Sequence, residues 1–297
     1  MQNILITGAD GQLGSVLKSL AANYPEFKFY YTDIAELNIT NQAAIDDFVS
    51  GHNITCILNT AGYTNADKAE SDSEQAFLIN GTAVGFLAES AKKNNALLIH
   101  ISTDYVFGNN HFRPIVESAS PYPLSVYAAS KVDGEEKAIE HNPNTVILRT
   151  SWLHSKFGHN FVKTIIKLGN ERDQLRVVFD QIGSPTYAVD LAQTILMLIP
   201  IWNKISAPEI YHYSNEGVAS WYDFAVATLD LAGINCKIQP IETKDYPLPA
   251  ARPHYSLLNK EKIKTKYGIT IPHWQESLKK CIAEITKENH LIDVRHN

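Results

Sequence analysis

The sequence is poor in cysteine. Its 297 residues include three, Cys56, Cys236 and Cys281, which lie far apart and are not spaced as in zinc-binding or redox motifs. An odd, scattered set does not form the disulfide framework of a small secreted domain. We therefore expect reduced cysteines and a cytoplasmic protein.

Long apolar runs and an excess of basic charge are also lacking. The longest apolar run, Ile195 to Ile201, contains Pro200, and the first residues show no basic segment followed by an apolar stretch. The sequence thus predicts neither a membrane span nor a targeting peptide. The formal net charge is -6, and no basic cluster occurs. Because nucleic-acid binding needs clustered Lys and Arg, a nucleic acid is not an expected partner.

Up to about residue 150, the sequence alternates short apolar segments with helical ones. This alternation is typical of βαβ units, which build a parallel sheet covered on both faces. We predict an α/β fold, a Rossmann-like doubly wound parallel sheet, in a dinucleotide-binding domain of residues 1–150. The expected strands are Asn3–Thr7, Phe27–Tyr31, Ile54–Asn59, Leu97–Ser102 and Thr145–Arg149, and the expected helices are Leu13–Ala22, Gln42–Val49, Ser73–Lys93 and Val126–His141.

After residue 150 the alternation loosens, and helical segments are separated by short strands and loops that contain Pro. We expect residues 151–297 to form mainly a smaller α+β substrate-binding lobe, with a cleft between the lobes. Residues 180–200 are apolar enough to pack back on the sheet. The expected helices are Asn160–Leu168, Val189–Leu198, Trp221–Ala232 and His273–Thr286.

A glycine-rich loop, Gly8-Ala9-Asp10-Gly11-Gln12-Leu13-Gly14, follows the first expected strand and opens the first helix. Glycine lets the backbone turn tightly and approach a ligand closely, and a helix N-terminus favours an anion such as a pyrophosphate. The strand-loop-helix context therefore predicts a dinucleotide site, with a turn that binds no ligand as the alternative.

Two further segments follow strands at the same edge of the expected sheet. Asp33 ends the second strand, where a carboxylate can bind the adenosine ribose and repel a 2′-phosphate, which favours NADH. An Asp that merely caps the next loop is an equal alternative. Small residues at Asn59–Gly62 follow the third strand and let the backbone pass close to a cofactor, unless they only end the strand.

Tyr127 and Lys131 are spaced i, i+4 in an expected helix, so both side chains lie on one face. We expect the ammonium to lower the pKa of the phenol and ease proton exchange with a substrate oxygen. The spacing alone is common and gains meaning from the glycine loop. Thr103, after the fourth strand, is the candidate to hold a carbonyl oxygen, whereas Ser102 is expected to bond its own backbone. His100 lies in an apolar strand and is interpreted as a hydrogen-bonded core residue.

Seven segments carry a resemblance to known proteins: Gly8–Gly14, Ala61–Glu70, Ser102–Phe107, Tyr127–Lys131, Arg149–Trp152, Gly183–Thr186 and Ala251–Pro253. Over nearly its whole length, the chain resembles the extended short-chain dehydrogenases/reductases and, within them, the dTDP-4-dehydrorhamnose reductase family. The resemblance implies reduction of the C4 keto group of dTDP-4-dehydro-β-L-rhamnose to dTDP-L-rhamnose, in deoxysugar and cell-surface polysaccharide synthesis, by a monomer or homodimer.

The resemblance also implies roles for single residues. Tyr127 would donate the proton, Lys131 would assist it and anchor the nicotinamide ribose, and Thr103 would hold the carbonyl oxygen. Tyr127 and Lys131 would also bind the coenzyme, NADPH or NADH. The other coenzyme-binding residues would be Gly8, Asp10, Gly11, Gln12, Leu13, Gly14, Asp33, Asn38, Ile39, Ala61, Gly62 and Tyr63. The nucleotide sugar would be bound by Thr103, Asp104, Tyr105, Trp152 and Arg252.

Two positions depart from the family pattern. Asn38 stands where many relatives carry Asp near the adenine, which weakens that assignment. Ser15 stands where magnesium-linked dimers of some relatives use an acidic residue, so we expect no bound metal. Among other activities, a sugar-nucleotide dehydratase would need a Glu base where this chain has Tyr105. A C4 epimerase and a non-catalytic nucleotide-binding subunit remain open alternatives.

Overall fold

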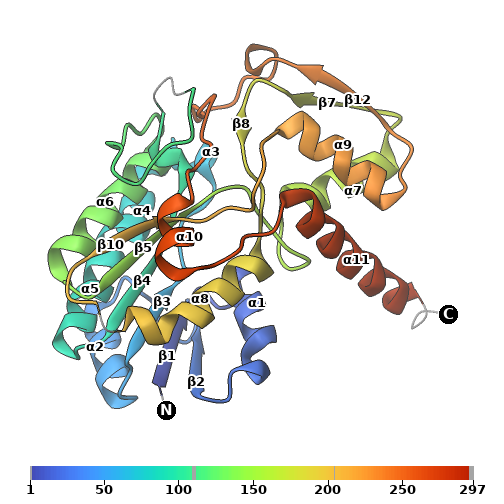
Figure 1. The fold of residues 1–297 in the computed structure, drawn as a ribbon. Coiled ribbons are helices and arrows are strands. Elements are labelled where there is room, and N and C mark those ends of the chain that lie inside the picture. The colour runs from blue at the N-terminus through green and yellow to red at the C-terminus, as the bar shows by residue number, and fades with distance from the viewer. Residues whose placement is uncertain (1, 109–111, 204, 294–297) are drawn as a thin grey trace.

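The computed structural model describes residues 2–108, 112–203 and 205–293, and its centre is a six-stranded parallel sheet (Figure 1). The spatial order is β2-β1-β3-β4-β5-β10. The α/β class predicted from the sequence is confirmed, and the five expected strands are all present. The sheet strands are β1 Gln2–Thr7, β2 Phe27–Thr32, β3 Cys56–Asn59, β4 Leu97–Thr103, β5 Thr145–Thr150 and β10 Glu209–His212.

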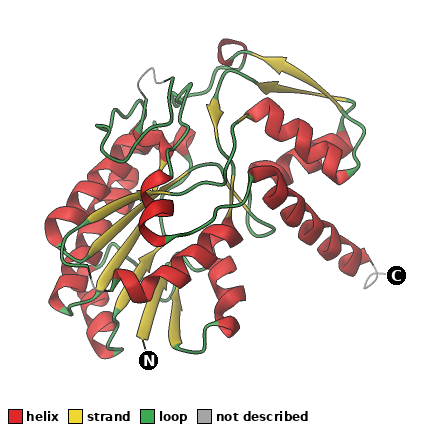
Figure 2. Cartoon of the chain, in the orientation of Figure 1, coloured by secondary structure: helices red, strands yellow, loops and turns green. Residues whose placement is uncertain are grey.

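Helices cover both faces of this sheet, as expected of a doubly wound fold (Figure 2). On one face, α1 (Gln12–Leu20) and α8 (Ala188–Trp202) pack on alternate strand residues such as Ile4 and Leu58. On the other face, apolar residues of the strands pack against α2 (Gln42–Gly51), α5 (Ala83–Lys93) and α6 (Val126–His141). Since all strands are parallel, the loops after β1 to β5 meet at one edge of the sheet.

The long helix expected at residues 73–93 is not continuous. It divides into α4 (Ser73–Phe77), a π-helical turn η2 (Leu78–Thr82) and α5. The turn lies where the chain crosses α6 very closely, because a side chain on Gly134 would overlap the carbonyl of Asn80. Widening of the helix at this crossing also directs Asn80 towards the loop that follows β3.

The rest of the chain forms a second lobe, at the upper right in Figure 1. Helices α7 (Phe161–Glu171), α9 (Trp221–Ala232) and α11 (Trp274–Asp293) pack beside three two-stranded sheets. The expected helix Trp221–Ala232 has the same bounds as α9, and the expected helix His273–Thr286 is longer in the structure.

The remaining elements of the chain are short. The strands are β6 Leu153–His154, β7 Gln174–Val178, β8 Ile182–Gly183, β9 Thr186–Tyr187, β11 Ala219–Ser220 and β12 Lys237–Ile241, and the short helices are η1 Ala21–Asn23, α3 Ala66–Ala69, η3 Asp104–Val106, η4 Thr243–Asp245 and α10 Glu261–Tyr267.

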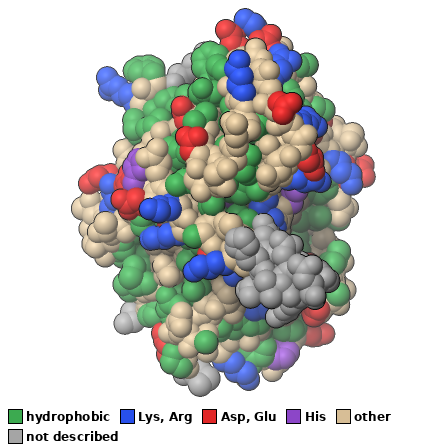
Figure 3. Space-filling view, turned by 90° about the vertical axis from the view of Figure 1, so that its right-hand side faces the viewer, with side chains coloured by type: hydrophobic (Ala, Val, Ile, Leu, Met, Phe, Trp, Pro, Cys, Tyr) green, Lys and Arg blue, Asp and Glu red, His purple; other side chains and the backbone are tan. Residues whose placement is uncertain are grey.

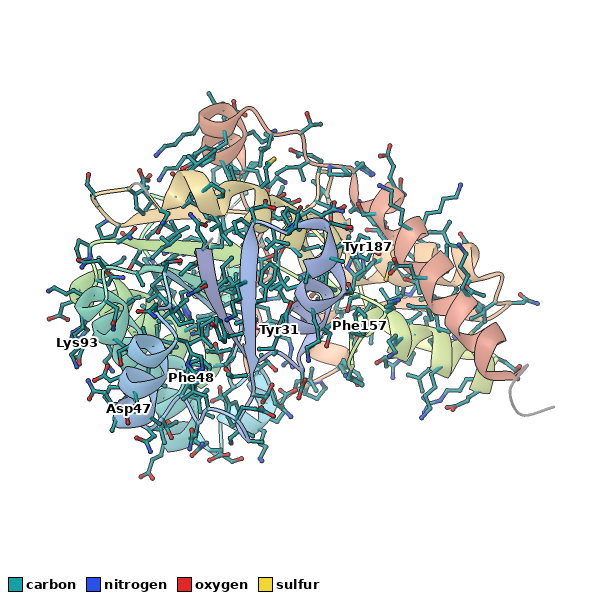
Figure 4. The ribbon with its side chains drawn as sticks, turned by 90° about the horizontal axis from the view of Figure 1, so that it is seen from below. Tyr31, Asp47, Phe48, Lys93, Phe157 and Tyr187 are labelled. Atoms are coloured by element: carbon teal, nitrogen blue, oxygen red, sulfur yellow. The ribbon has the colours of Figure 1, made fainter. Side chains whose placement is uncertain are left out.

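The two lobes are joined by packed side chains. In Figure 4, Phe157 of the second lobe lies beside α1 and packs on the apolar cluster that α1 helps to form. Tyr187 lies near α11 within the second lobe, where its hydroxyl donates a hydrogen bond to Glu284 at 2.9 Å. The molecular face in Figure 3 carries basic and acidic side chains interspersed with apolar ones. None of the helices in the described part of the chain is long and apolar enough to cross a membrane.

Candidate active site

A cavity of about 1130 Å³ opens at the carboxyl edge of the sheet. Such a volume is at the upper end for ligand sites and is suited to two large ligands side by side. It brings together most of the residues singled out from the sequence: Gly8, Gly11, Gln12, Leu13, Asp33, Asn38, Ile39, Ala61, Gly62, Thr103, Asp104, Tyr105, Tyr127, Lys131, Trp152 and Arg252. The structure does not place Asp10, Gly14 or Tyr63 in its lining.

The glycine loop forms one wall of the cavity, and each of its three glycines meets a different structural requirement. Gly8 has φ +65°, and a Cβ there would lie 2.6 Å from the Cα of Ala61. Gly14 presses against the backbone of Ala9 inside the fold, so it does not reach the cavity. Gly11 faces more open space and caps α1 without a side-chain acceptor. The first N–H groups of α1 are therefore available for an anion, and the loop fits a pyrophosphate.

Asp33 lies half-buried at the end of β2, next to the glycine loop. Its carboxylate accepts hydrogen bonds from the backbone N–H groups of Asp10, at 3.2 Å, and Ile34, at 2.8 Å. These bonds fix the carboxylate at the cavity wall, where Asn38 and Ile39 also lie. The side chain of Asn38 is exposed and accepts from both the N–H and the hydroxyl of Thr40, so it is held within its own turn.

Tyr63 is held away from the cavity by its own hydrogen bonds. Its hydroxyl donates to Asp72 at 3.0 Å, and its backbone N–H and C=O both bond the side-chain amide of Asn80. The same amide donates to the hydroxyl of Ser130 on α6 at 2.9 Å. Asn80 thereby ties the loop after β3 to the helix that carries Tyr127.

Tyr127 lies in the first turn of α6, which Ser125 caps by accepting from the N–H of Ala128. Burial raises the pKa of Tyr127 to about 12. A hydrogen bond with Thr103 lowers this pKa somewhat, whereas the nearby carboxyl group of Asp104 raises it further. The sequence-based expectation that Lys131 lowers the pKa of Tyr127 is therefore not met in this structure, because desolvation of the phenolate outweighs the other effects on this pKa. Tyr127 carries its proton at neutral pH.

Lys131 is buried one turn after Tyr127. Its Nζ donates to the carbonyl of Ile101 at 2.7 Å and lies 3.2 Å from Nε2 of His100. Burial lowers the pKa of Lys131 to about 8, and the carboxylate of Glu135 partly offsets this. The amine is thus held against β4 at the cavity wall, with its charge easily lost.

The end of β4 supplies a buried carboxyl group. Asp104 is 2% exposed and accepts hydrogen bonds from the hydroxyls of Ser256 and Thr103. Burial raises the pKa of Asp104 to about 7, and the bonds from Ser256 and Thr103 limit the rise. Ser102 differs from expectation: its hydroxyl is buried and has no hydrogen-bond partner among the described residues.

Aromatic and charged side chains form the part of the cavity towards the second lobe. Trp152 has a left-handed backbone, with φ +48°, and its ring stacks on that of Trp221 at 3.7 Å. A non-glycine residue in this conformation is strained, and the stacking holds it there. The guanidinium of Arg252 donates to both carboxylate oxygens of Asp67, at 3.0 and 2.7 Å, and hydrogen bonds Tyr105.

Sequence reasoning missed several residues of this site. Trp221 lines the cavity but has no motif around it. Gln12 lies in the predicted glycine loop, but the sequence does not predict that it connects this loop to the second lobe. Its Oε1 accepts hydrogen bonds from Asn160 at 2.9 Å and from Ser155 at 3.2 Å. Since these partners lie more than a hundred residues away, no local signal identifies them.

The structure offers little for metal chemistry. In the described parts of the chain, no group of three or more His, Cys, Asp or Glu side chains is placed to hold a metal ion. The described cysteines are free thiols, with Cys56 and Cys281 buried.

Hydride transfer to a carbonyl needs a cradle for a dinucleotide and a neutral acid beside the carbonyl oxygen. The cavity has both, in a doubly wound sheet, which places the protein among the nicotinamide-dependent oxidoreductases of the short-chain dehydrogenase/reductase class. Residues 1–287 match the sequence family described as the RmlD substrate binding domain, and the chain belongs to that family.

Individual relatives agree with this assignment. The chain is 40% identical over 294 residues to a dTDP-4-dehydrorhamnose reductase of Aggregatibacter actinomycetemcomitans, covering 95% of this chain and 99% of the relative. The crystal structure of such a reductase from Clostridium acetobutylicum matches with a TM-score of 0.92 and 38% identity, over 96% of this chain and 100% of that chain. The enzyme from Bacillus anthracis, solved in complex with NADP, matches with a TM-score of 0.90 and 37% identity, over 96% and 99%. The resemblance inferred from the seven segments is confirmed.

Proposed function

We propose that the protein reduces the C4 keto group of dTDP-4-dehydro-β-L-rhamnose to give dTDP-L-rhamnose, with NADPH or NADH as the reductant. The observation that carries this proposal is that Tyr127, Thr103 and Lys131 line one cavity together with the glycine loop. Burial also raises the pKa of Tyr127 to about 12, which keeps the phenol protonated at neutral pH. The relatives named as dTDP-4-dehydrorhamnose reductases, which match almost end to end, support the choice of substrate.

A coenzyme bound along the glycine loop and against Lys131 would supply a hydride to C4 of the sugar. Tyr127 donates its phenolic proton to the C4 oxygen, so that one hydride and one proton convert the ketone to an alcohol. Thr103 donates a hydrogen bond to the same oxygen and stabilises its developing negative charge. Lys131 holds its ammonium against the carbonyl of Ile101, from where it anchors the ribose and stabilises the phenolate that remains.

The residues of the second lobe would bind the nucleotide sugar. Trp152, fixed by its stacking on Trp221, gives a flat surface for a sugar or base ring. Asp104 and Tyr105 lie beside Tyr127, whose ring is 5.8 Å from that of Tyr105. We assign the diphosphate to Arg252, whose bonds to Asp67 would have to be shared with it.

The proposal includes a cytoplasmic protein, a monomer or homodimer, that acts in deoxysugar synthesis for cell-surface polysaccharides. The reduced cysteines support the compartment. The assay follows NADPH or NADH oxidation with dTDP-4-dehydro-β-L-rhamnose, beside UDP- and GDP-linked 4-ketosugars. We expect one coenzyme oxidised per dTDP-sugar reduced. Product without net coenzyme oxidation would instead indicate an epimerase, and an absence of turnover with every ketosugar would contradict the proposal.

A further inference from the structure

Three polar side chains lie in register on three neighbouring strands of the sheet, β1, β3 and β4. Thr7 of β1 pairs with Asn59 of β3, and Asn59 pairs with His100 of β4. Each of the three is at most 1% exposed. Aligned residues of neighbouring parallel strands point to the same face of a sheet, so these side chains form one buried row, the Thr7–Asn59–His100 row.

The neighbouring row of side chains on the same face of the sheet is entirely apolar. Two residues earlier on the same strands stand Leu5, Ile57 and Leu98, which are fully buried in the cluster formed with α5. The polar row therefore lies on the face covered by α5 and α6. Burying polar groups beside such residues is unfavourable unless each is hydrogen bonded, so the row is not a result of packing alone.

Hydrogen bonds connect the row from end to end and lead to the amine of Lys131. The hydroxyl of Thr7 donates to Oδ1 of Asn59 at 2.6 Å, and Nδ2 of Asn59 lies 3.0 Å from Nδ1 of His100. On the other side of the ring, Nε2 of His100 lies 3.2 Å from Nζ of Lys131. Both nitrogens of a fully buried imidazole are thus engaged, one by an amide and one by the amine.

The row can satisfy Lys131 both with and without its proton. With Nδ2 of Asn59 facing the ring, Nδ1 accepts and Nε2 carries the ring proton, which suits an uncharged amine. Rotation of the Asn59 amide by half a turn presents Oδ1 instead, so that the ring proton moves to Nδ1. Nε2 of His100 then accepts from the ammonium. Either arrangement leaves Nζ free to donate to Ile101.

We propose that His100 is a positioning residue for Lys131, and that the Thr7–Asn59–His100 row changes its hydrogen-bond arrangement as Lys131 gains or loses its proton. The row thereby keeps Nζ in one place in both states. On α6 itself, Tyr127 lies one turn before Lys131 and Glu135 lies one turn after it, and the carboxylate of Glu135 acts to raise the pKa of Lys131. Glu135 is paired with Arg149 of β5 at 2.6 Å.

This role rests on the proposed function, in which Lys131 anchors the coenzyme beside Tyr127. Because burial lowers the pKa of Lys131 to about 8, both states of the amine are populated slightly above neutral pH. A hydrogen bond from an ammonium to an imidazole nitrogen is stronger than one between two neutral groups. Removal of the ring therefore destabilises the ammonium more than the amine, and the pKa of Lys131 should fall further.

The test measures the proton affinity of Lys131 without using turnover. Only the uncharged amine reacts with acetic anhydride, so the rate of Lys131 acetylation against pH, measured by mass spectrometry, gives the midpoint of its titration. Lys131 lines the cavity, where the reagent can reach it. We expect this midpoint to fall by about one pH unit in His100→Leu and by less in His100→Gln, whose amide oxygen still accepts a hydrogen bond.

The matched control is His212→Gln, because His212 is equally buried in β10 of the same sheet but bonds the carbonyl of Ile115. Its midpoint should equal that of the native protein. In ketosugar assays, the alkaline limb of kcat should move to lower pH in His100→Leu, with a smaller loss at acid pH. Purely structural damage would lower kcat equally at every pH.

The outcomes separate the two proposals. A shifted midpoint in a protein that reduces no ketosugar would overturn the proposed function and leave the role of His100 intact. Normal turnover with equal midpoints in His100→Leu and the native protein would overturn the role of His100. If His100→Leu does not fold, the comparison of His100→Gln with His212→Gln decides, since the proposal requires a shift in the first variant alone.

Discussion

At the scale of single residues, the state of Tyr127 depends on its surroundings more than on its spacing from Lys131. The i, i+4 spacing suggests an ammonium that lowers the pKa of the phenol. In the fold, burial raises this pKa to about 12. A reductase benefits, because the phenol must begin the reaction protonated. The spacing predicts which residues meet, but not the balance between desolvation and charge.

Tyr127→Phe should therefore lower kcat by about 10²- to 10⁴-fold, the range for loss of a general acid, while the dissociation constant of the coenzyme stays nearly constant. The substitution removes the proton and little contact surface. Coenzyme fluorescence titration and NADPH oxidation give the two values. Tyr30→Phe, a half-buried tyrosine of β2, is the control and should behave as the native protein. Near-native kcat in Tyr127→Phe would assign the acid to another group.

We expect the choice between NADPH and NADH to depend on a single residue, Asp33. The Asp33 carboxylate is fixed by the N–H groups of Asp10 and Ile34 at the wall of the cavity, where it would repel a 2′-phosphate. Asp33→Ala should raise the kcat/KM ratio of NADPH to NADH at least about tenfold, since one like-charge contact is removed.

Steady-state kinetics with both coenzymes check this prediction. Asp47→Asn is the matched control, because it removes a carboxylate that is exposed on α2 (Figure 4) and does not line the cavity. An unchanged ratio in Asp33→Ala would show that the carboxylate does not face the 2′ position.

At the scale of elements, regular patterns were predictable and short or locally distorted elements were not. Apolar strands and the helix Trp221–Ala232 carry a clear periodicity, and their bounds are nearly those expected. β10, at Glu209–His212, has four residues and becomes a sheet strand only through pairing with β5. The π turn at Leu78–Thr82 arises from the close crossing of α6, which no local pattern records.

Asn80 gives this π turn a consequence that can be measured. Asn80→Ala removes hydrogen bonds to both backbone groups of Tyr63 and to Ser130, so it should lower the free energy of unfolding by about 2–4 kcal/mol. The coenzyme should also bind more weakly, because the loop with Ala61 and Gly62 loses its attachment to α6.

Urea denaturation and coenzyme titration measure both effects. Ser90→Ala is the control: this serine is fully buried in α5, and its hydroxyl has no partner among the described residues. Its removal should leave stability nearly unchanged or slightly higher. Equal effects of the two substitutions would mean that the hydrogen bonds of Asn80 contribute nothing specific.

At the scale of the whole molecule, the contacts that join the lobes were beyond sequence reasoning. Gln12 meets Asn160, and Arg252 meets Asp67, across more than a hundred residues. Motifs show that such residues matter, but only the fold shows that the site is completed from both lobes. The same holds for buried ionisable groups, whose surroundings come from distant segments and together set the dependence of stability on pH.

Buried histidines should make the protein sensitive to mild acid. Burial lowers the pKa of His154 to about 4 and of His212 to about 3, and that of His100 lies well below its usual range for the same reason. These rings stay uncharged in the fold but take up protons in the unfolded chain below about pH 6.5, so acid favours unfolding. Asp104 acts in the opposite sense: with its pKa raised to about 7, it takes up a proton in the fold before the unfolded chain does.

On unfolding between about pH 6.5 and pH 5, the three histidines take up about three protons and Asp104 releases about one. The net uptake is therefore about two protons. The free energy of unfolding should then fall by about 2–3 kcal/mol for each pH unit of acidification. His154→Gln should reduce this slope by about 1.4 kcal/mol per pH unit, and Asp104→Asn should increase it by the same amount, so the two variants control each other. Urea denaturation across this range measures all three slopes. A flat native profile would contradict this prediction, because it would mean that the folded and unfolded chains bind equal numbers of protons over this range.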